Sequence, residues 1–317
     1  MIVFEQIDAI ALPAGRPIHV AVGTFDGVHR GHRQLLRRMA ERARDEGGLA
    51  VVFTFRNHPR AVVGDGQAPP LLTPWPMKRA LLGELPLDAV VGIAFDHEFS
   101  RTEPEDFVRD VLIGRCRATA IASGADFRFG RGGRGNAGLL ARMAGECGVV
   151  YEPFPLITDE GGRVSSTRAR ALLAEGNAEG AAELLGRPHR VLGRVVSGDA
   201  LGRTIGFPTA NLRVDGETLL PADGVYAVGV RLAGEDEARP GMMNLGVRPT
   251  VGGREHRAEV HLIDWEGELA GQDLTVDFLG RLRGEERFTG LEALRAQLAR
   301  DRAAALALWR QKASAGA

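Results

Sequence analysis

The first half of the chain alternates short apolar runs with amphipathic stretches. Runs rich in β-branched residues predict strands at residues 19–23, 50–55, 89–95, 118–122 and 149–154. Between them, apolar residues recur at helical spacing and predict helices at residues 32–46, 74–84, 103–113 and 136–146. Strands that alternate with helices indicate an α/β domain with a parallel sheet, and such sheets bind ligands at the carboxyl ends of their strands.

The second half has a different pattern. Short strand-like runs, separated by Gly, Pro and Asp, lie at residues 190–196, 209–214, 225–233, 242–247, 258–265 and 274–282. This spacing predicts a small antiparallel β-barrel, and the helical periodicity of residues 291–310 predicts a terminal α-helix. Between the halves, residues 166–185 predict two short helices broken near Gly176-Asn177, followed by a linker at Gly186-Arg187-Pro188.

Length and composition agree with two globular domains. The chain has 317 residues, more than one hydrophobic core usually spans. We therefore expect the fold class α/β plus β, with a Rossmann-like domain at residues 1–186 and a β-barrel domain with a terminal α-helix at residues 187–317. Lys plus Arg (40) nearly balance Asp plus Glu (41), which argues against a nucleic-acid partner.

Cysteine content and the N-terminal sequence predict a cytoplasmic protein. Only Cys116 and Cys147 occur, too few for a disulfide framework or a cysteine-rich zinc site, so a reducing compartment fits. Residues 1–15 include Glu5 and Asp8 and no basic leader, and no apolar run is long enough to span a bilayer. We expect no membrane partner.

A pair of histidines follows the first predicted strand. His29 and His32 are three residues apart, so they share a face of the first helical turn. That turn also presents free backbone N–H groups and the positive end of the helix dipole, which favour bound phosphate. Gly31 has no side chain, so we expect a phosphate to approach between the two imidazoles, which could stabilise charge on a nucleotide α-phosphate during in-line displacement. Two solvated surface histidines are the alternative, which the flanking glycines at a strand end make less favoured.

A glycine-rich segment offers a competing function. Residues 130–135, Gly-Arg-Gly-Gly-Arg-Gly, match the spacing of a dinucleotide-binding fingerprint between a predicted strand and a predicted helix. A nicotinamide-dependent oxidoreductase is therefore a second hypothesis. Against it, the fingerprint normally occupies the first strand-helix unit of its domain, where this chain has the histidine pair. A hairpin-like loop without a ligand is equally compatible with the segment.

The densest polar motif of the second half lies at residues 202–211. Thr209 and Asn211 alternate along an extended segment, so a hydroxyl and an amide oxygen point to one side. Both are hard oxygen ligands suited to Mg²⁺ bound with nucleotide phosphates. Neither the Walker A pattern nor the protein-kinase signature set occurs, so a kinase built on this motif would belong to a different class. A turn without a ligand is the plainer interpretation of the motif taken alone.

These motifs resemble those of a known family. His29-Arg30-Gly31-His32 resembles the signature of the nucleotidyltransferase superfamily, and residues 23–32 resemble its bacterial bifunctional riboflavin kinase/FAD synthetase branch. The chain departs from the family pattern at Thr24, where Asn is frequent, and at Asn57, where Pro is usual. Further segments of the first half fit the branch: Thr54-Phe55-Arg56-Asn57-His58-Pro59, Leu72-Thr73-Pro74 with Lys78, Gly124-Ala125-Asp126-Phe127-Arg128-Phe129-Gly130 and Ser165-Ser166-Thr167-Arg168-Ala169-Arg170.

The resemblance implies a nucleotidyltransferase domain that adenylylates FMN to FAD. It implies that His29 and His32 act at the transferred phosphate and that the Ser-Ser-Thr-Arg segment contacts phosphate. The residues that it implies for nucleotide or flavin binding in this domain are Gly23, Phe25, Asp26, Gly31, His58, Asp126, Ser165, Ser166, Thr167 and Arg168.

The second half resembles riboflavin kinases. The resemblance implies that Glu259 is the general base for the ribityl hydroxyl and that Thr209 and Asn211 hold the metal-nucleotide. Taken by itself, Glu259 could equally be an outward-facing strand residue. The residues implied for nucleotide or flavin binding here are Gly202, Arg203 and Asn244. The matching segments are Pro208-Thr209-Ala210-Asn211, Gly224-Val225-Tyr226, Asn244-Leu245-Gly246-Val247-Arg248-Pro249-Thr250 and Glu259-Val260-His261, with a departure at Leu269-Ala270, where Tyr-Gly is frequent.

Taken together, the resemblance implies two reactions in series. Riboflavin and ATP give FMN and ADP at the barrel, and FMN and ATP give FAD and pyrophosphate at the histidine pair. The expected ligands are therefore ATP, Mg²⁺ and flavins, and the expected partners are small molecules. Besides the oxidoreductase, a non-catalytic flavin-binding regulator with degenerate sites stays open as a hypothesis.

Overall fold

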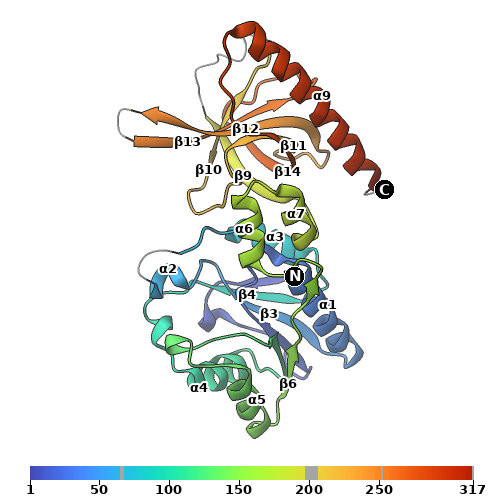
Figure 1. Cartoon of the computed structure of the whole chain (residues 1–317). Coiled ribbons are helices and arrows are strands. Elements are labelled where there is room, and N and C mark those ends of the chain that lie inside the picture. The colour runs from blue at the N-terminus through green and yellow to red at the C-terminus, as the bar shows by residue number, and fades with distance from the viewer. Residues whose placement is uncertain (65–67, 197–205, 251–252, 316–317) are drawn as a thin grey trace. The chain divides into compact units, whose positions relative to one another are not determined.

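The computed structural model describes residues 1–64, 68–196, 206–250 and 253–315. Contacts between residues divide the chain into two compact units, Met1–Ser166 and Thr167–Ala317, each with its own hydrophobic core. Figure 1 shows a sheet covered by helices in the first unit and a barrel with one long helix in the second. The predicted fold class is confirmed.

The first unit is built on a six-stranded parallel sheet of order β1-β4-β3-β2-β5-β6. The edge strand β1 (Ile2–Phe4) is not predicted by the sequence, because three residues are too short to show periodicity. The strand order reverses at β2, which lies between β3 and β5, so the ligand crevice of such a sheet is expected at the carboxyl ends of β2 and β5. The five predicted strands are confirmed as β2 (Ile18–Val22), β3 (Leu49–Phe55), β4 (Ala89–Ile93), β5 (Ala120–Gly124) and β6 (Val150–Phe154).

Helices cover both faces of this sheet. On one face pack α1 (Arg30–Asp45) and α3 (Trp75–Gly83), and on the other pack a π-helix at Phe107–Arg115 and α5 (Ala137–Glu146). The single turn α4 (Pro104–Asp106) leads directly into the π-helix. The helix predicted at residues 103–113 is therefore in place, but most of it is a π-helix. The shorter elements are 3₁₀ turns at Ile7–Ala9, Asp26–Val28, Phe99–Arg101 and Arg131–Gly133, α2 (Arg60–Val63), and the hairpin of β7 (Thr158–Asp159) and β8 (Gly162–Arg163).

The second unit contains a closed antiparallel barrel of order β10-β13-β12-β11-β14-β9. Two helices precede it, α6 (Ser166–Ala174), which starts at the last residue of the first unit, and α7 (Ala178–Leu185). They are broken where predicted, because Gly176 has a φ of 80° and Asn177 caps α7. The predicted strands are confirmed as β9 (His189–Val196), β10 (Ala210–Val214), β11 (Gly224–Leu232), β12 (Arg239–Thr250), β13 (Gly253–Leu262) and β14 (Asp273–Arg283).

The terminal helix α9 (Leu291–Ala315) packs on the outside of the barrel (Figure 1). The ring of Trp309 occupies the space over Gly229, where a Cβ would come within 2.9 Å of it. Arg283 of β14 donates to the buried carboxylate of Asp301 at 2.9 Å. One glycine and one buried ion pair thus fix the helix against the strands.

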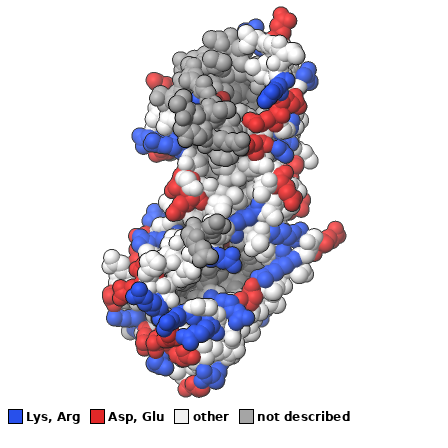
Figure 2. Space-filling model, turned by 60° about the vertical axis from the view of Figure 1, so that its left-hand side comes forward, with Lys and Arg blue, Asp and Glu red and all other residues white. Residues whose placement is uncertain are grey.

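The surface of the chain carries mixed charge. Figure 2 shows both acidic and basic side chains on the face in view, and the formal net charge of the whole chain is -1 at pH 7. Within the described ranges, no helix combines the length and apolar character needed to cross a bilayer.

Candidate active sites

The segment between β2 and α1 has a strained backbone. Phe25 and Val28 adopt left-handed conformations, with φ of 47° and 40°, and Gly27 has a φ of 81°. A left-handed conformation is uncommon for a residue with a side chain and rarest for a β-branched one. Such a residue costs about 1–3 kcal/mol and persists only where the surrounding structure enforces it, as at binding and catalytic sites. The strain therefore marks this loop as a functional candidate.

The two histidines lie at the start of α1. His29 is the N-cap, and its Nδ1 accepts a hydrogen bond from the backbone N–H of His32 at 3.3 Å. The proton of the neutral His29 ring is then on Nε2, which can donate to a bound anion. The two rings stack with centroids 3.6 Å apart and planes 16° apart, so no phosphate fits between them. The expected position between the imidazoles is wrong, and a phosphate would instead meet the ring edges and the N-terminus of α1.

Packing fixes the orientation of both rings. The Phe25 ring meets His32 edge to face, with centroids 5.1 Å apart and an interplanar angle of 80°. A Cβ at Gly23 would lie 3.1 Å from the Phe25 ring, and one at Gly31 would lie 3.2 Å from the His29 ring. Glycine at these two positions therefore lets the aromatic rings pack as they do. The structure brings these four predicted residues together around His32.

Burial keeps both histidines neutral. Desolvation, and after it the nearby Arg163 guanidinium, lowers the pKa of His29 to about 4, although the Asp26 carboxylate opposes the shift. Desolvation also holds the pKa of His32 well below its usual range, with the charges of His29, Lys78 and Arg163 acting in the same direction. At neutral pH the pair therefore offers neutral N–H donors to a phosphate.

Asp26 faces the interior of the first unit. Its buried carboxylate accepts hydrogen bonds from the backbone N–H groups of Leu72 at 3.2 Å and Thr73 at 2.9 Å, and from the Thr73 hydroxyl at 3.0 Å. That hydroxyl in turn accepts from the N–H of Gly27 at 2.8 Å. Ser166 donates from Oγ to the Asp26 carbonyl at 2.8 Å. Asp26 thus anchors the histidine loop, and its predicted part in ligand binding would be indirect.

Asp126 is paired with a cation that the sequence analysis missed. Its carboxylate accepts from Arg163 of β8 at 2.5 Å, and both side chains are about half exposed. Since Arg163 also lowers the pKa of both histidines, its guanidinium lies close to them. The sequence signal for Arg163 was its position, two residues before Ser165 of the predicted phosphate-binding segment.

That segment crosses the boundary between the two compact units. Ser165 and Ser166 belong to the first unit, and Thr167 and Arg168 to the second.

An apolar cavity of about 320 Å³ lies at the carboxyl ends of β2 to β5. Phe127 and Phe129 stack there with centroids 5.5 Å apart, and Phe55 meets Phe95 edge to face at 5.2 Å. A cavity with aromatic walls suits a flat ring system. Among the described residues that line this cavity, His58 alone was predicted as a site residue. The sequence signal for the cavity is a phenylalanine at the end of, or shortly after, each of the successive strands β3, β4 and β5. The lining includes Thr24, Phe55, His58, Phe95, Phe99, Phe107, Phe127 and Phe129.

Asn57 helps to shape this cavity. Its Nδ2 donates to the Phe95 carbonyl, and the Phe95 N–H donates to its Oδ1, both at 2.8 Å. The side chain therefore fastens the segment after β3 to the segment after β4. The asparagine found where the family usually has proline thus has a structural explanation in this chain.

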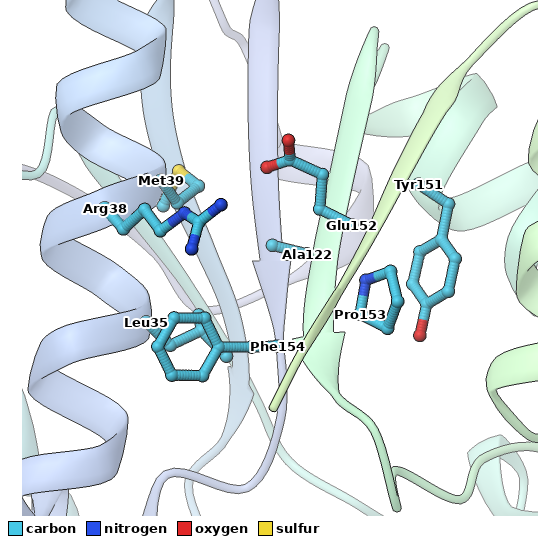
Figure 3. Close-up of a pocket in the computed structure, with 8 residues that line it drawn as sticks. All are labelled: Leu35, Arg38, Met39, Ala122, Tyr151, Glu152, Pro153 and Phe154. Carbon is cyan, nitrogen blue, oxygen red and sulfur yellow. The ribbon is translucent and has the colours of Figure 1, made fainter. Parts of the chain in front are cut away.

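A smaller cavity of about 190 Å³ lies between α1 and the β5–β6 side of the sheet (Figure 3). Leu35 of α1 and Ala122 of β5 line it, and Phe154 of β6 packs against the core that contains them. Figure 3 shows the Arg38 guanidinium and the Glu152 carboxylate on opposite sides of this opening. No motif in the sequence pointed to these residues.

The glycine-rich segment at residues 130–135 is a tight turn. Phe129 and Gly135 form an isolated bridge across it, and Gly130 does not directly follow β5, which ends at Gly124. A Cβ at Gly130 would lie 2.6 Å from Pro104, and one at Gly135 would lie 2.6 Å from the Phe129 ring. Close packing explains these glycines, so the oxidoreductase hypothesis loses the feature that motivated it.

Three predicted site residues of the barrel meet on neighbouring strands. Glu259 of β13 is paired with Asn211 of β10 on one side and with Asn244 of β12 on the other. Directly paired residues point to the same face of a sheet. The adjacent residues Val260 and Met243 belong to the barrel interior, so the three polar side chains face outward. Glu259 is thus an outward-facing strand residue, and it stands in a row of oxygen-bearing side chains.

His261 fastens the segment that leads to Thr209. It is buried, lies on the same face of β13 as Glu259, and has its Nδ1 2.8 Å from the carbonyl oxygen of Pro208. Its ring packs on Phe207 with centroids 5.4 Å apart. Thr209 itself is exposed and comes directly before β10. His261 therefore holds the metal-binding candidate Thr209 in place.

Two further residues of the barrel motif, Gly202 and Arg203, lie outside the described residues.

Arg257 lies on the same strand as Glu259, with its Nη1 3.4 Å from Oε1 of the carboxylate. Both side chains of this pair are partly exposed, so the carboxylate can be reached from outside the barrel.

Comparison with known proteins identifies the family. A family model described as FAD synthetase matches residues 13–168, and one described as riboflavin kinase matches residues 185–309. A bifunctional riboflavin kinase/FMN adenylyltransferase from Escherichia coli (strain K12) is 40% identical over 282 residues, which cover 89% of this chain and 90% of that protein. The enzyme of the same description from Pseudomonas fluorescens is 38% identical over 297 residues, which cover 93% of this chain and 94% of that protein. The one from Bacillus subtilis (strain 168) is 32% identical over 292 residues, which cover 90% of this chain and 91% of that protein.

A solved structure agrees with this in fold. A crystal structure from Streptococcus pneumoniae, described as a macrolide-efflux protein, matches with a TM-score of 0.85 and 31% identity, over 95% of this chain and 96% of that one. The description applies to that protein, and what the two chains share is their fold.

Fold and sites together define a two-unit enzyme that joins a nucleotidyltransferase unit to a kinase barrel. The chain belongs to the bifunctional riboflavin kinase/FMN adenylyltransferase family. The family expected from the sequence motifs is confirmed, and neither the oxidoreductase nor the non-catalytic regulator is supported.

Proposed function

We propose that the barrel unit phosphorylates riboflavin to FMN with ATP, and that the first unit adenylylates FMN to FAD with a second ATP and releases pyrophosphate. The observation that carries this proposal is that each unit matches a catalytic family model of its own and holds its own polar site. The two sites lie in units with separate cores. The reactions are therefore separable by mutation.

In the first unit, the FMN phosphate attacks the α-phosphate of ATP in line with the departing pyrophosphate. The Nε2–H of His29 and the ring of His32 donate to the α-phosphate as negative charge builds on it. The free N–H groups at the start of α1 act in the same direction. On the family resemblance alone, we also propose that Ser165, Ser166, Thr167 and Arg168 contact nucleotide or flavin phosphate.

The two cavities of the first unit divide the bound ring systems between them. The aromatic cavity takes the flavin ring, because its walls carry stacked phenylalanines and Thr24 of the histidine loop lines its edge. The smaller cavity takes the adenine of ATP. Leu35 lies three residues after His32 on α1, so this cavity continues the helix face that bears the histidine.

In the barrel unit, Glu259 accepts the proton of the ribityl hydroxyl as the γ-phosphoryl group moves to that oxygen. Support comes from its outward orientation and from its position between Asn211 and Asn244. Mg²⁺ enters with ATP as part of the substrate. The hydroxyl of Thr209 and the amide oxygen of Asn211 are hard donors of the kind that Mg²⁺ prefers, so the residues present fit the ion.

We place the division between the two functional domains at residues 186–187. Gly186 ends α7 in a left-handed conformation with a φ of 72°, and β9 begins at His189, so the predicted linker lies between regular elements.

We also propose that the protein is cytoplasmic, since both thiols, buried Cys116 and exposed Cys147, are free.

Product analysis tests the proposed function. Pure protein incubated with riboflavin, ATP and Mg²⁺ should form FMN first and FAD later, as resolved by chromatography. With FMN, ATP and Mg²⁺ but no riboflavin, it should form FAD and pyrophosphate. Chelation of Mg²⁺ should stop riboflavin phosphorylation. Flavin binding without turnover of ATP would contradict the proposal.

A further inference from the structure

A lysine is buried beneath the histidine loop. Lys78 of α3 is 2% exposed, although lysine is among the residues least often buried. Burial lowers the pKa of its ammonium to about 8, and the Asp26 carboxylate opposes that shift, so the side chain is charged at neutral pH. A charge kept inside the protein needs partners that compensate for its lost hydration.

Those partners are backbone carbonyls of the crevice. The Nζ of Lys78 donates to the carbonyl of Thr24 at 2.9 Å and to the carbonyl of Phe55 at 2.8 Å. Thr24 follows β2, and Phe55 ends β3, the neighbouring parallel strand. The ammonium therefore connects two strands at the edge where a parallel sheet binds its ligands.

This connection lies directly before the strained turn. The Thr24 carbonyl accepts a second hydrogen bond from Oγ1 of Thr54 at 3.0 Å, which fixes the peptide that leads into Phe25. Phe25 has the left-handed backbone, and its ring meets His32 edge to face. A chain of fixed groups thus runs from the buried ammonium through Thr24 and Phe25 to the imidazole.

We propose that Lys78 is a positioning residue for adenylyl transfer, which holds the Thr24 and Phe55 carbonyls so that Phe25 keeps His32 in its working orientation. The inference rests on the proposed adenylylation of FMN by the first unit. Lys78 is enclosed by protein and acts through the loop. A merely structural lysine would stabilise the unit without affecting the reaction, and the two roles predict different kinetics.

Lys78→Met separates the two roles. Methionine is unbranched and apolar, so it fills the site while removing both hydrogen bonds and the charge. The affinity and stoichiometry of FMN binding, followed by quenching of flavin fluorescence, should match the parent and report that the first unit is folded. FMN is also the product of the barrel, so loss of the site in the first unit would lower the stoichiometry. The kcat for FAD formation should fall about 10²-fold, the loss typical when a catalytic group is misplaced by about 1 Å. KM for FMN and for ATP should change little.

Leu81→Ala is the matched control. Leu81 lies one turn further along α3, is buried in the same core, and has no polar group to bond the loop. This variant should unfold at a lower urea concentration than the parent and keep the parent kcat. The expected pattern is thus low kcat with intact FMN binding in Lys78→Met, and lowered stability with intact kcat in Leu81→Ala.

Three results would overturn the inference: a parent kcat in Lys78→Met, a fall in kcat that is equally large in Leu81→Ala, or a fall confined to KM. If Lys78→Met does not bind FMN, the comparison is made with Lys78→Gln, which keeps one donor, and a parent kcat in that variant overturns the inference equally. A parent protein that forms no FAD from FMN would contradict the proposed function itself, so the two failures are distinguishable.

Discussion

The two sites of this chain are built in opposite ways. In the first unit, buried groups hold the histidines: a strained turn at Phe25, the anchored carboxylate of Asp26 and the ammonium of Lys78. In the barrel, Glu259 and Asn244 stand on the outer face of a sheet, where strand register alone brings them together. A buried site depends on groups that never touch the substrate, whereas a site set by register depends mainly on its own side chains.

This difference predicts how far from each site a substitution can lie and still alter activity or stability. Around the histidine pair, changes in the loop, the core and the pH should alter function or stability. Around Glu259, the effect should be concentrated in the residues of the outer face. Because one protein carries both sites, each activity is an internal reference for the other.

Glu259→Gln should have the largest effect. The amide keeps the shape of the side chain but cannot accept the ribityl proton, so riboflavin phosphorylation should fall about 10²-fold or more. Adenylylation of added FMN should continue at the parent rate, as should both activities of the exposed control Glu266→Gln. Initial rates across a pH series should also show an acid limb that the Gln variant lacks. A parent rate with an unchanged acid limb would make Glu259 an ordinary strand residue.

His32→Ala, or His29→Ala, should have the next largest effect. Removal of one donor at the transferred phosphate should slow FAD formation about 10²-fold, while FMN still accumulates from riboflavin. Chromatography of the flavins after fixed times measures both steps in one sample. The exposed His97→Ala serves as the control. Loss of both activities in a well-folded His32→Ala protein would remove the separation between the sites on which the comparison rests.

Acid should destabilise the first unit through His29. The pKa of His29 is about 4 in the folded protein and about 6.5 when unfolded, so between these values the unfolded state binds more protons. Stability is therefore unaffected above pH 6.5 and is lost as the pH falls toward 4, by about 2 kcal/mol at pH 5. Urea unfolding at pH 7 and pH 5 should show this loss in the parent and less of it in His29→Gln. Equal losses in the two proteins would show that another group carries the acid sensitivity.

The smallest effects should come from the two cavities, and they should differ in substrate. Phe127→Ala removes a stacking wall worth about 1 kcal/mol, so KM for FMN should rise about fivefold while KM for ATP stays constant. Phe154→Ala should raise KM for ATP and leave KM for FMN unchanged. Steady-state kinetics of FAD formation measure both constants. If Phe127→Ala instead raised KM for ATP and Phe154→Ala raised KM for FMN, adenine would occupy the aromatic cavity and the flavin ring the smaller one.

Local patterns in the sequence predicted much of this structure. The break between α6 and α7 was predicted because Gly176-Asn177 has local turn chemistry. The five central strands of the first unit and the six strands of the barrel were predicted from the alternation and length of apolar runs, whereas the short β7–β8 hairpin was not. β1 and the π-helix at Phe107–Arg115 were not, since three residues carry no period and a π-helix shares the apolar pattern of an α-helix.

For the sites, the sequence identified the residues that share a motif. His29 with His32, and Thr209 with Asn211, were found because they are neighbours along the chain. It did not identify Arg163, whose approach to the histidines depends on the β7–β8 hairpin. Nor did it identify the aromatic cavity, whose walls come from segments far apart in the chain.

By itself, the sequence determined the order of the longer elements, the family and the motif residues, because spacing, turn chemistry and motif identity are local properties of the chain. Only the tertiary structure decided how those residues work together. The stacking of His29 on His32 excludes a phosphate from between them, and Asp26 turns inward to hold the loop. The register of β10, β13 and β12 sets Glu259 between two amides. Each of these depends on packing and burial between distant segments, which no single stretch of sequence contains.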